Sequence, residues 1–153
     1  MSNIIIENAK LSDVEAMKSV LDVWAKKGLL LSRSRLDMYE NIRDFTVAKD
    51  DGVVVGLAGL HILWFDLVEI RSLAVLEERQ GEGIGRLLVE RALEDAKELG
   101  IKRVFSLTYK PGFFEKLGFS EVEKSELPHK VWMDCLNCTQ FPDCAEIAMT
   151  REV

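Results

Sequence analysis

Apolar and polar positions along the chain follow two different periods. The clearest helical period runs from Ile84 to Leu99, where apolar side chains recur every three or four positions and Gly100 follows. A second apolar stripe follows Ser12-Asp-Val-Glu15, which has the form of a capping box, and it ends near Gly28. These patterns predict two amphipathic helices. A weaker helix is expected over Arg35 to Ile42.

Short apolar runs bounded by turn residues predict strands between these helices. Phe45 to Ala48 and Val53 to Leu60 are separated by Asp50-Asp51-Gly52, which is a hairpin signal. The other expected strands are Ile4 to Ile6, Leu67 to Val75, Arg103 to Leu107, Val131 to Met133 and Ala145 to Thr150, with a helical turn at Phe113 to Leu117. The order of elements predicts one α/β (α+β) domain over residues 1–153, of which about 121–153 is irregular.

Composition narrows the classes of function. The 153 residues include 26 acidic and 20 basic side chains, for a net charge of −6, and this excess of acid argues against general nucleic-acid binding. No uncharged apolar run is long enough to cross a bilayer, and no basic segment precedes a hydrophobic stretch at the N-terminus. We therefore expect a cytoplasmic protein with no membrane partner. An anionic ligand would need locally gathered cations or backbone amides.

The loop Gln80-Gly-Glu-Gly83-Ile-Gly85-Arg86 meets that need, because it connects a predicted strand to the start of the strongest predicted helix. Glycines allow successive N–H groups to converge, and the helix N-terminus adds positive potential, so the loop suits a phosphate or diphosphate. Arg79 and Arg86 flank it and are candidates to supply charge. The alternative is a glycine-rich turn without a ligand.

Two common phosphate-binding motifs do not fit this loop. A P-loop requires Lys-Ser or Lys-Thr after its last glycine, and neither dipeptide is present. A dinucleotide-binding fold requires Gly-x-Gly-x-x-Gly, but Arg86 or Leu88 occupies the position of the third glycine in the two available registers. The loop therefore points to a different class of anion-binding fold.

On these residues the sequence resembles the GNAT superfamily of N-acetyltransferases. The matching stretches are Val68-Glu-Ile-Arg-Ser-Leu-Ala-Val75, Glu77-Glu-Arg-Gln80-Gly-Glu-Gly-Ile-Gly85-Arg-Leu-Leu88 and Phe113-Phe-Glu-Lys-Leu-Gly-Phe119. The resemblance implies a mixed, splayed β-sheet flanked by helices, with acetyl-CoA as cosubstrate between the strand ending at Val75 and the strand at Val104. Its diphosphate would lie on the loop amides, and its pantetheine would pair with the backbone at Leu73 and Val75. The implied cofactor-binding residues are Leu73, Ala74, Val75, Gln80, Gly81, Glu82, Gly83, Ile84, Gly85, Arg86 and Phe114.

A narrower resemblance is to the short, stand-alone N-acetylglutamate synthases, which are amino-acid N-acetyltransferases of arginine biosynthesis. It rests on Gly28-Leu-Leu-Leu-Ser-Arg-Ser34, Glu69-Ile-Arg-Ser-Leu-Ala-Val75, and Leu127-Pro-His-Lys-Val-Trp-Met-Asp-Cys135 with Cys138, Cys144 and Ala148-Met149. Ser32 stands where the family usually has proline. The resemblance implies acetyl transfer to the α-amine of L-glutamate. Arginines suit its two carboxylates, so the substrate-binding candidates are Arg33, Ser34, Arg71 and Lys130. Lys130 has a solvated surface role as its alternative.

Acetyl transfer requires a base that takes a proton from the acceptor ammonium. Glu69, on the strand that would line the cleft, is the candidate, and it resembles the general-base glutamate of histone-acetylating members of the superfamily. Its alternative role is an ion pair with Arg71, on the same strand face. Many members have a tyrosine acid where this chain has Phe114, so Tyr109 is the substitute acid, with a packed aromatic as its alternative. A thiol is itself a good leaving group.

The remaining residues of interest are Cys135, Cys138 and Cys144, with His129 nearby. One Cys-x-x-Cys pair is present where a zinc site of this type commonly has two, so reduced thiols without a metal are expected, and a zinc site completed by His129 or Asp134 is the alternative. A homodimer is compatible with the sequence. Two other functions remain open, namely acetylation of another small-molecule or protein N-terminal amine, and non-catalytic CoA binding.

Overall fold

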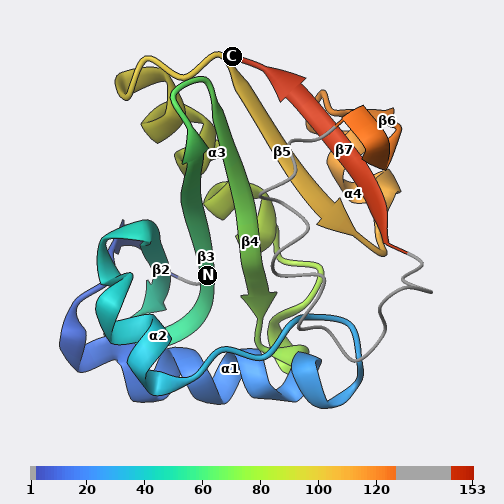
Figure 1. The fold of residues 1–153 in the computed structure, drawn as a ribbon. Coiled ribbons are helices and arrows are strands. Elements are labelled where there is room, and N and C mark those ends of the chain that lie inside the picture. The colour runs from blue at the N-terminus through green and yellow to red at the C-terminus, as the bar shows by residue number, and fades with distance from the viewer. Residues whose placement is uncertain (1–2, 127–145) are drawn as a thin grey trace.

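The computed structural model describes residues 3–126 and 146–153 (Figure 1). Its centre is a seven-stranded sheet in the order β1-β2-β3-β4-β5-β7-β6, in which only β4 and β5 pair in parallel. The strands are β1 (Ile4–Asn8), β2 (Phe45–Asp50), β3 (Val53–Trp64), β4 (Leu67–Val75), β5 (Arg103–Thr108), β6 (Ser120–Val122) and β7 (Ile147–Glu152). The α-helices are α1 (Val14–Lys26), α2 (Arg35–Glu40), α3 (Ile84–Glu98) and α4 (Pro111–Glu115), and short 3-10 turns cover Leu11–Asp13, Ile42–Asp44, Glu77–Arg79 and Lys124–Glu126.

Two helical layers cover opposite faces of the sheet, as alternation along the strands shows. Leu57 on β3 packs into a core with α1 and α2, whereas the next residue, Ala58, packs with Ile84 and Leu88 of α3. Figure 1 shows α1 and α2 in front of the strands and α3 behind them. The predicted mixed α/β fold is therefore confirmed. No helix in the described part of the chain is long and apolar enough to span a membrane.

The predicted hairpin between β2 and β3 is also confirmed. Asp51 and Gly52 both have positive φ angles, 49° and 82°, as a two-residue primed turn requires. Both strands run beyond their predicted ends, to Asp50 and Trp64.

Several local predictions were wrong. The capping box at Ser12 does not form, because Asp13 accepts a hydrogen bond from the backbone N–H of Lys10 at 2.8 Å and residues 11–13 form a 3-10 turn. Leu87 and Leu99 were placed on the buried stripe of α3, but they are 41% and 55% exposed. The helix expected to reach Ile42 ends at Glu40, and the helical turn expected from Phe113 begins at Pro111.

The last part of the chain contributes more to the sheet than its expected irregularity suggested. Strand β7 pairs with β5 along its whole length, and β6, which the sequence analysis did not predict, pairs with β7. The expected strand over Val131 to Met133 lies outside the described residues.

The sheet opens where β4 and β5 part (Figure 1). Their ladder covers Leu67 to Glu69 opposite Arg103 to Phe105 and goes no further. At the next position, the buried Ser106 hydroxyl donates to the Ile70 carbonyl at 2.9 Å, so a side chain replaces the missing backbone bond. Beyond this point the two strands diverge without further backbone pairs and leave a fork.

A β-bulge shapes the β4 arm of the fork. Gly59 faces Arg71 and Leu57 faces Ala74, so two residues of β4 lie opposite the single residue Ala58. One of them, Ser72, has a φ of 56°. Such a bulge bends the strand and redirects its following side chains.

Candidate active site

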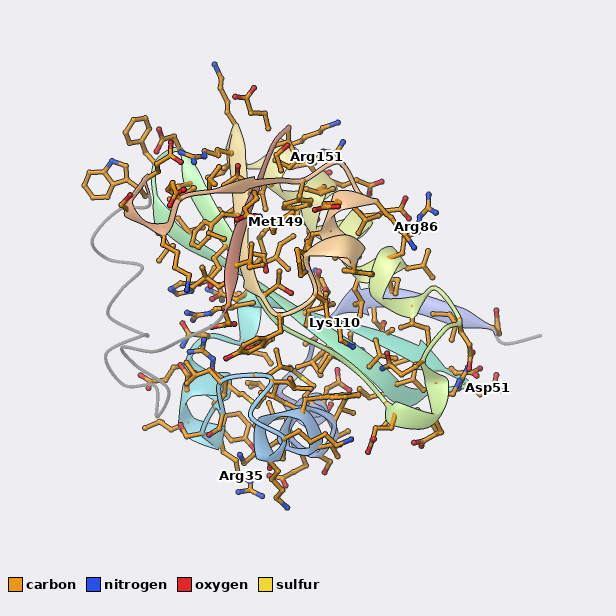
Figure 2. All side chains as sticks on the ribbon, turned by 90° about the vertical axis from the view of Figure 1, so that its right-hand side faces the viewer. Arg35, Asp51, Arg86, Lys110, Met149 and Arg151 are labelled. Carbon is orange, nitrogen blue, oxygen red and sulfur yellow. The ribbon has the colours of Figure 1, made fainter. Side chains whose placement is uncertain are left out.

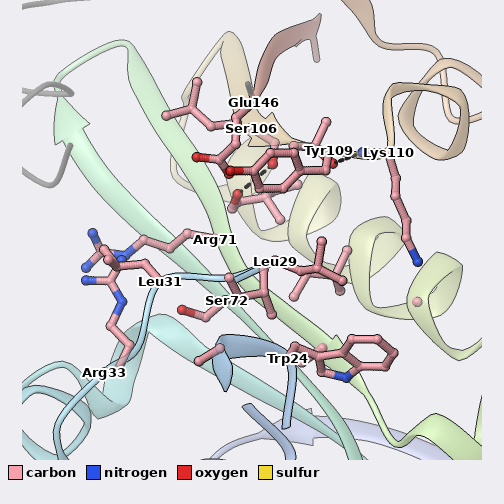
Figure 3. Close-up of a pocket in the computed structure, with 18 of the residues that line it drawn as sticks. Trp24, Leu29, Leu31, Arg33, Arg71, Ser72, Ser106, Tyr109, Lys110 and Glu146 are labelled. Atoms are coloured by element: carbon pink, nitrogen blue, oxygen red, sulfur yellow. Dashed lines mark hydrogen bonds between the residues drawn. The ribbon is translucent and has the colours of Figure 1, made fainter. Parts of the chain in front are cut away.

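A cavity of about 840 Å³ occupies the fork (Figure 3). Its walls come from β4, β5, the end of α1 and the loop between α1 and α2. The predicted site residues that line it are Arg33, Ser34, Glu69, Arg71, Leu73, Ala74, Val75, Gln80, Gly85, Tyr109 and Phe114. The side chain of Ile84 instead lies in the core, and Lys130 is outside the described residues.

Two arginines and a glutamate form the polar part of this cavity. Arg33 and Arg71 are 9% and 11% exposed at their side chains, and Figure 3 shows them converging from the α1–α2 loop and from β4. Glu69 is also buried, and its Oε1 lies 4.0 Å from Nη1 of Arg71. The alternative contact of Glu69 with Arg71 is therefore present as a loose pair. It leaves the proposed role of Glu69 as a base untested.

The arginine-bearing loop is held from two sides. The backbone carbonyl of Arg33 accepts a hydrogen bond from Nζ of Lys18 at 2.9 Å. The guanidinium Nη1 of Arg33 lies 3.6 Å from Oδ2 of Asp37. Ser34 is the N-cap of α2, because its Oγ accepts from the backbone N–H of Asp37 at 3.0 Å. A hydroxyl that accepts in this way still has its own O–H to donate.

The glycine loop enters α3 with two of its glycines in the left-handed backbone region. Gly81 and Gly83 have φ angles of 79° and 82°, and Gly83 is the N-cap of α3 without a capping side chain. The first amides of this helix are thus not satisfied by a cap. Gly85 faces Phe113, and a Cβ at Gly85 would lie 3.4 Å from the Phe113 ring.

Arg79 has a structural role that the sequence analysis did not predict. Its guanidinium makes two hydrogen bonds to Glu82, at 2.8 and 2.9 Å, and lies 2.9 Å from Asp50 at the end of β2. These contacts raise the pKa of Arg79, with the hydrogen bonds to Glu82 as the largest cause and those to Asp50 next. Arg79 therefore neutralises Glu82 and ties the glycine loop to the sheet.

The carbonyl of Val75 is already hydrogen-bonded. The backbone N–H of Leu76 donates to Val55 on β3, so the adjoining Val75 carbonyl points to the opposite edge, toward the fork. It accepts from Trp24 Nε1 at 2.8 Å and from Gln80 Nε2 at 3.0 Å. The sequence analysis placed Trp24 only in the apolar stripe of a helix, although a partly buried indole N–H usually has a hydrogen-bond partner.

Comparison with known proteins agrees with this geometry. The Acetyltransferase (GNAT) family matches residues 15–119. The chain belongs to this family. It is an acetyl-CoA-dependent N-acetyltransferase, with acetyl-CoA as cosubstrate. The GNAT fold, with a mixed seven-stranded sheet and flanking helices, is confirmed.

Individual relatives refine the comparison. An uncharacterized N-acetyltransferase of Chlorobaculum tepidum is 44% identical over 95% of this chain and 94% of its own length. An amino-acid acetyltransferase of Mycobacterium tuberculosis is 40% identical over 84% of this chain and 75% of its own. The structure of N-acetylglutamate synthase from Neisseria gonorrhoeae, complexed with coenzyme A and N-acetyl-glutamate, superposes with a TM-score of 0.90 at 26% identity. The superposition covers 99% of this chain and 35% of the longer Neisseria gonorrhoeae protein.

Many GNAT members have a tyrosine that can act as general acid at the position of Phe114 in this chain. A phenylalanine side chain has no proton to donate there. Phe114 is 3% exposed and packs edge-on against Phe113 and Phe119, each at 5.1 Å between ring centroids. Tyr109 does face the cavity, and Figure 3 shows it beside Ser106 and Glu146. Glu146 was not among the predicted site residues. The role of Tyr109 as an acid stays a prediction.

No group of three or more potential metal ligands occurs in residues 3–126 and 146–153. The cysteines at 135, 138 and 144, together with His129, lie outside these ranges.

Proposed function

We propose that this enzyme transfers the acetyl group of acetyl-CoA to the α-amine of L-glutamate. The observation that carries the proposal is the convergence of Arg33 and Arg71 on the cavity that also contains Glu69. The relatives named amino-acid acetyltransferase and the likeness to an N-acetylglutamate synthase support it. Participation in arginine biosynthesis and a cytoplasmic location are part of the same proposal.

Recognition of the acceptor follows from the charges of the cavity. Glutamate has two carboxylates, and the chain as a whole has a net charge of −6, so an acidic acceptor needs a local positive site. Arg33 and Arg71 come from separate elements, which lets each guanidinium bind a different carboxylate in a bidentate manner. Ser34, which lines the cavity beside Arg33, contributes an O–H donor.

The reaction begins with proton transfer from the acceptor ammonium to Glu69, directly or through water. The neutral nitrogen attacks the thioester carbonyl carbon, and a C–N bond forms as the carbonyl π electrons move to oxygen. A backbone N–H near Val75 stabilises this oxyanion. Collapse of the intermediate breaks the C–S bond and releases the CoA thiolate. The nitrogen then loses one of its two protons, to the thiolate or to water, and the acetylated amino acid keeps the other as its amide N–H.

The test is release of free thiol with a panel of amines, comparing glutamate with glutamine, α-aminobutyrate and a peptide N-terminus. Arg71→Ala is expected to lower kcat/KM for glutamate by about 10- to 150-fold, the value of one lost charge-assisted pair. Glu69→Gln is expected to lower kcat about 10²- to 10⁴-fold for every amine. Arg43→Ala, an exposed arginine that does not line the cavity, serves as the control.

A preference for amines without a side-chain carboxylate would refute the glutamate assignment. Equal losses for all amines in Arg71→Ala would show that Arg71 does not read the acceptor. Rescue of an arginine auxotroph that lacks its N-acetylglutamate synthase would test the proposed pathway, and rescue is expected from wild type but not from Glu69→Gln.

A further inference from the structure

A histidine and an aspartate form a partly buried pair behind the wall of the fork cavity. Nδ1 of His61, on β3, lies 2.6 Å from Oδ2 of Asp44, which ends the 3-10 turn before β2. Their side chains are 27% and 23% exposed. An ionised carboxylate only accepts hydrogen bonds, so Nδ1 of a neutral imidazole carries the proton in this contact and Nε2 keeps its lone pair. Asp44 thus fixes the tautomer of His61.

His61 lies directly opposite Glu69, the proposed base. The two residues pair in the β3–β4 ladder, and opposite residues of an antiparallel pair hold their Cβ atoms about 4.5–5.5 Å apart on one face of the sheet. On the other side of β3, Phe45 pairs with Gly59, so Asp44, just before Phe45, reaches the residues that follow Gly59. His61 therefore lies between Asp44 and Glu69, with one carboxylate on each side of its strand.

His61 and Glu69 both lie on the face of the sheet that α1 and α2 cover. Leu57 of β3 packs against these helices, and His61, four residues further along the strand, shares its face by alternation. Glu69 lies between two residues of β4 that pack with α3, so it faces the opposite way from α3. Figure 2 shows these layers from the side, with Arg35 of α2 and Arg86 of α3 on opposite sides of the sheet.

The proposed mechanism leaves a proton on a buried carboxyl. Glu69 is 8% exposed, and a proton taken from the acceptor must leave it before the next turnover. Around it and His61 the charged groups are Arg71 on the same strand face and Asp44, with the exposed Arg43 beside Asp44. An arginine has no lone pair with which to accept a proton. Imidazole takes up and releases protons near neutral pH, and His61 is partly open to solvent.

We propose that His61, held by Asp44, receives through one water the proton that Glu69 takes from the acceptor ammonium. The Glu69 carboxyl gives its proton to the water, which gives one of its own to Nε2 of His61. The imidazolium then releases a proton from Nε2 to solvent, so that both side chains return to their starting forms. His61 is not among the described residues that line the cavity, and it is a positioning residue that acts through Glu69.

This inference rests on the proposed role of Glu69 as the base, but it does not depend on which amine is acetylated. Thiol release is therefore measured with acetyl-CoA and L-glutamate, or with the preferred amine of the panel if that is another one. The parameters compared are kcat and the KM of each substrate.

The first experiment compares wild type with His61→Gln. The variant is expected to lower kcat about 10- to 100-fold, because an amide does not relay a proton. The KM of each substrate should change less than about twofold, because His61 does not line the cavity. Glutamine keeps an N–H that can donate to Asp44, so a purely structural role predicts a kcat close to that of wild type. That result would overturn the proposal.

The second experiment is chemical rescue. His61→Ala leaves space for a small base, and added imidazole is expected to raise its kcat at least about fivefold, because free imidazole can take the proton in place of the side chain. Wild type and Glu69→Gln should not respond. Absence of rescue in folded His61→Ala would refute the relay. Circular dichroism and a thermal melt establish that each variant is folded.

Two further variants separate the outcomes. Asp44→Asn is expected to lower kcat about tenfold, because its amide can donate to Nδ1 and leave the proton on Nε2. Arg91→Gln is the matched control and should keep the wild-type kcat, since Arg91 and Asp95 form a comparably exposed pair, at 27% and 31%, on α3. If Glu69→Gln is as active as wild type, the base assignment fails. If Glu69→Gln is inactive but His61→Gln is fully active, the relay alone fails.

Discussion

The Ser106 hydroxyl offers a direct test of how the fork is held. It is buried at 4% exposure and donates to the Ile70 carbonyl at 2.9 Å, at the first position where β4 and β5 no longer pair through their backbones. Ser106→Ala deletes the donor and leaves a buried carbonyl unsatisfied. That loss is expected to cost about 1–3 kcal/mol of unfolding free energy. For a chain of this size it lowers Tm by roughly 2–12 °C.

The measurement is a thermal melt and a urea titration, each followed by circular dichroism. Ser19→Ala is a matched control, because the Ser19 hydroxyl also donates to a backbone carbonyl, that of Glu15 at 3.1 Å, but at an exposed helix position. Its effect should stay within about 0.5 kcal/mol. If Ser106→Ala were no more destabilising than Ser19→Ala, the hydrogen bond would not be what holds the two arms together at this point.

Two further predictions concern ion pairs. Arg79→Ala should weaken CoA binding roughly three- to tenfold in calorimetry, because the glycine loop loses its tie to Asp50 and the freed Glu82 carboxylate repels the diphosphate; unchanged affinity would contradict this. Lys49 lies 3.0 Å from both Glu7 and Asp13, and hydrogen bonds to these two raise its pKa above 10.5. The free energy of unfolding that protonated Lys49 contributes is therefore fully present below pH 10.5 and is lost as pH rises through the raised pKa. In urea titrations, the difference in unfolding free energy between wild type and Lys49→Gln should be constant from pH 7 to 9 and shrink above 10.5. A difference independent of pH up to 11.5 would refute this.

Short sequence motifs correctly predicted those elements whose conformation is decided by a few neighbouring residues. The Asp51-Gly52 turn and the glycine-led start of α3 are decided within a few residues, and both are present. The capping box predicted at Ser12 is absent. The carboxylate of Asp13 pairs with Lys49 of β2, a contact distant in sequence that the capping motif does not encode. Leu87 fits the helical stripe of α3 by spacing alone, but which part of a stripe is buried depends on the neighbouring strands. Strand β6 is three residues long, too short for any period to be read.

The residues of the candidate site also fall into those that the sequence predicted and those that depend on contacts distant in sequence. Strand alternation places Glu69 and Arg71 on one face of β4, and the resemblance to GNAT enzymes implied that β4 and the glycine loop share one cleft. Trp24 and Ser106 were missed because their partners lie 51 and 36 residues away. Arg33 was predicted from the charge of the expected acceptor. Its position opposite Arg71 depends on the hydrogen bond from Lys18 that holds the loop, and no local pattern encodes that contact.

The Val75 carbonyl shows what such distant contacts change. The resemblance to GNAT enzymes implied that the backbone at Val75 would pair with pantetheine, and the carbonyl does point toward the fork. A backbone carbonyl has two lone pairs. Trp24 and Gln80 already donate to this oxygen, at 2.8 and 3.0 Å. A pantetheine amide that donates to the Val75 carbonyl must therefore displace one of these side chains, whereas a pantetheine carbonyl that accepts from the Val75 N–H need not. The indole of Trp24 thus favours the second mode of pairing.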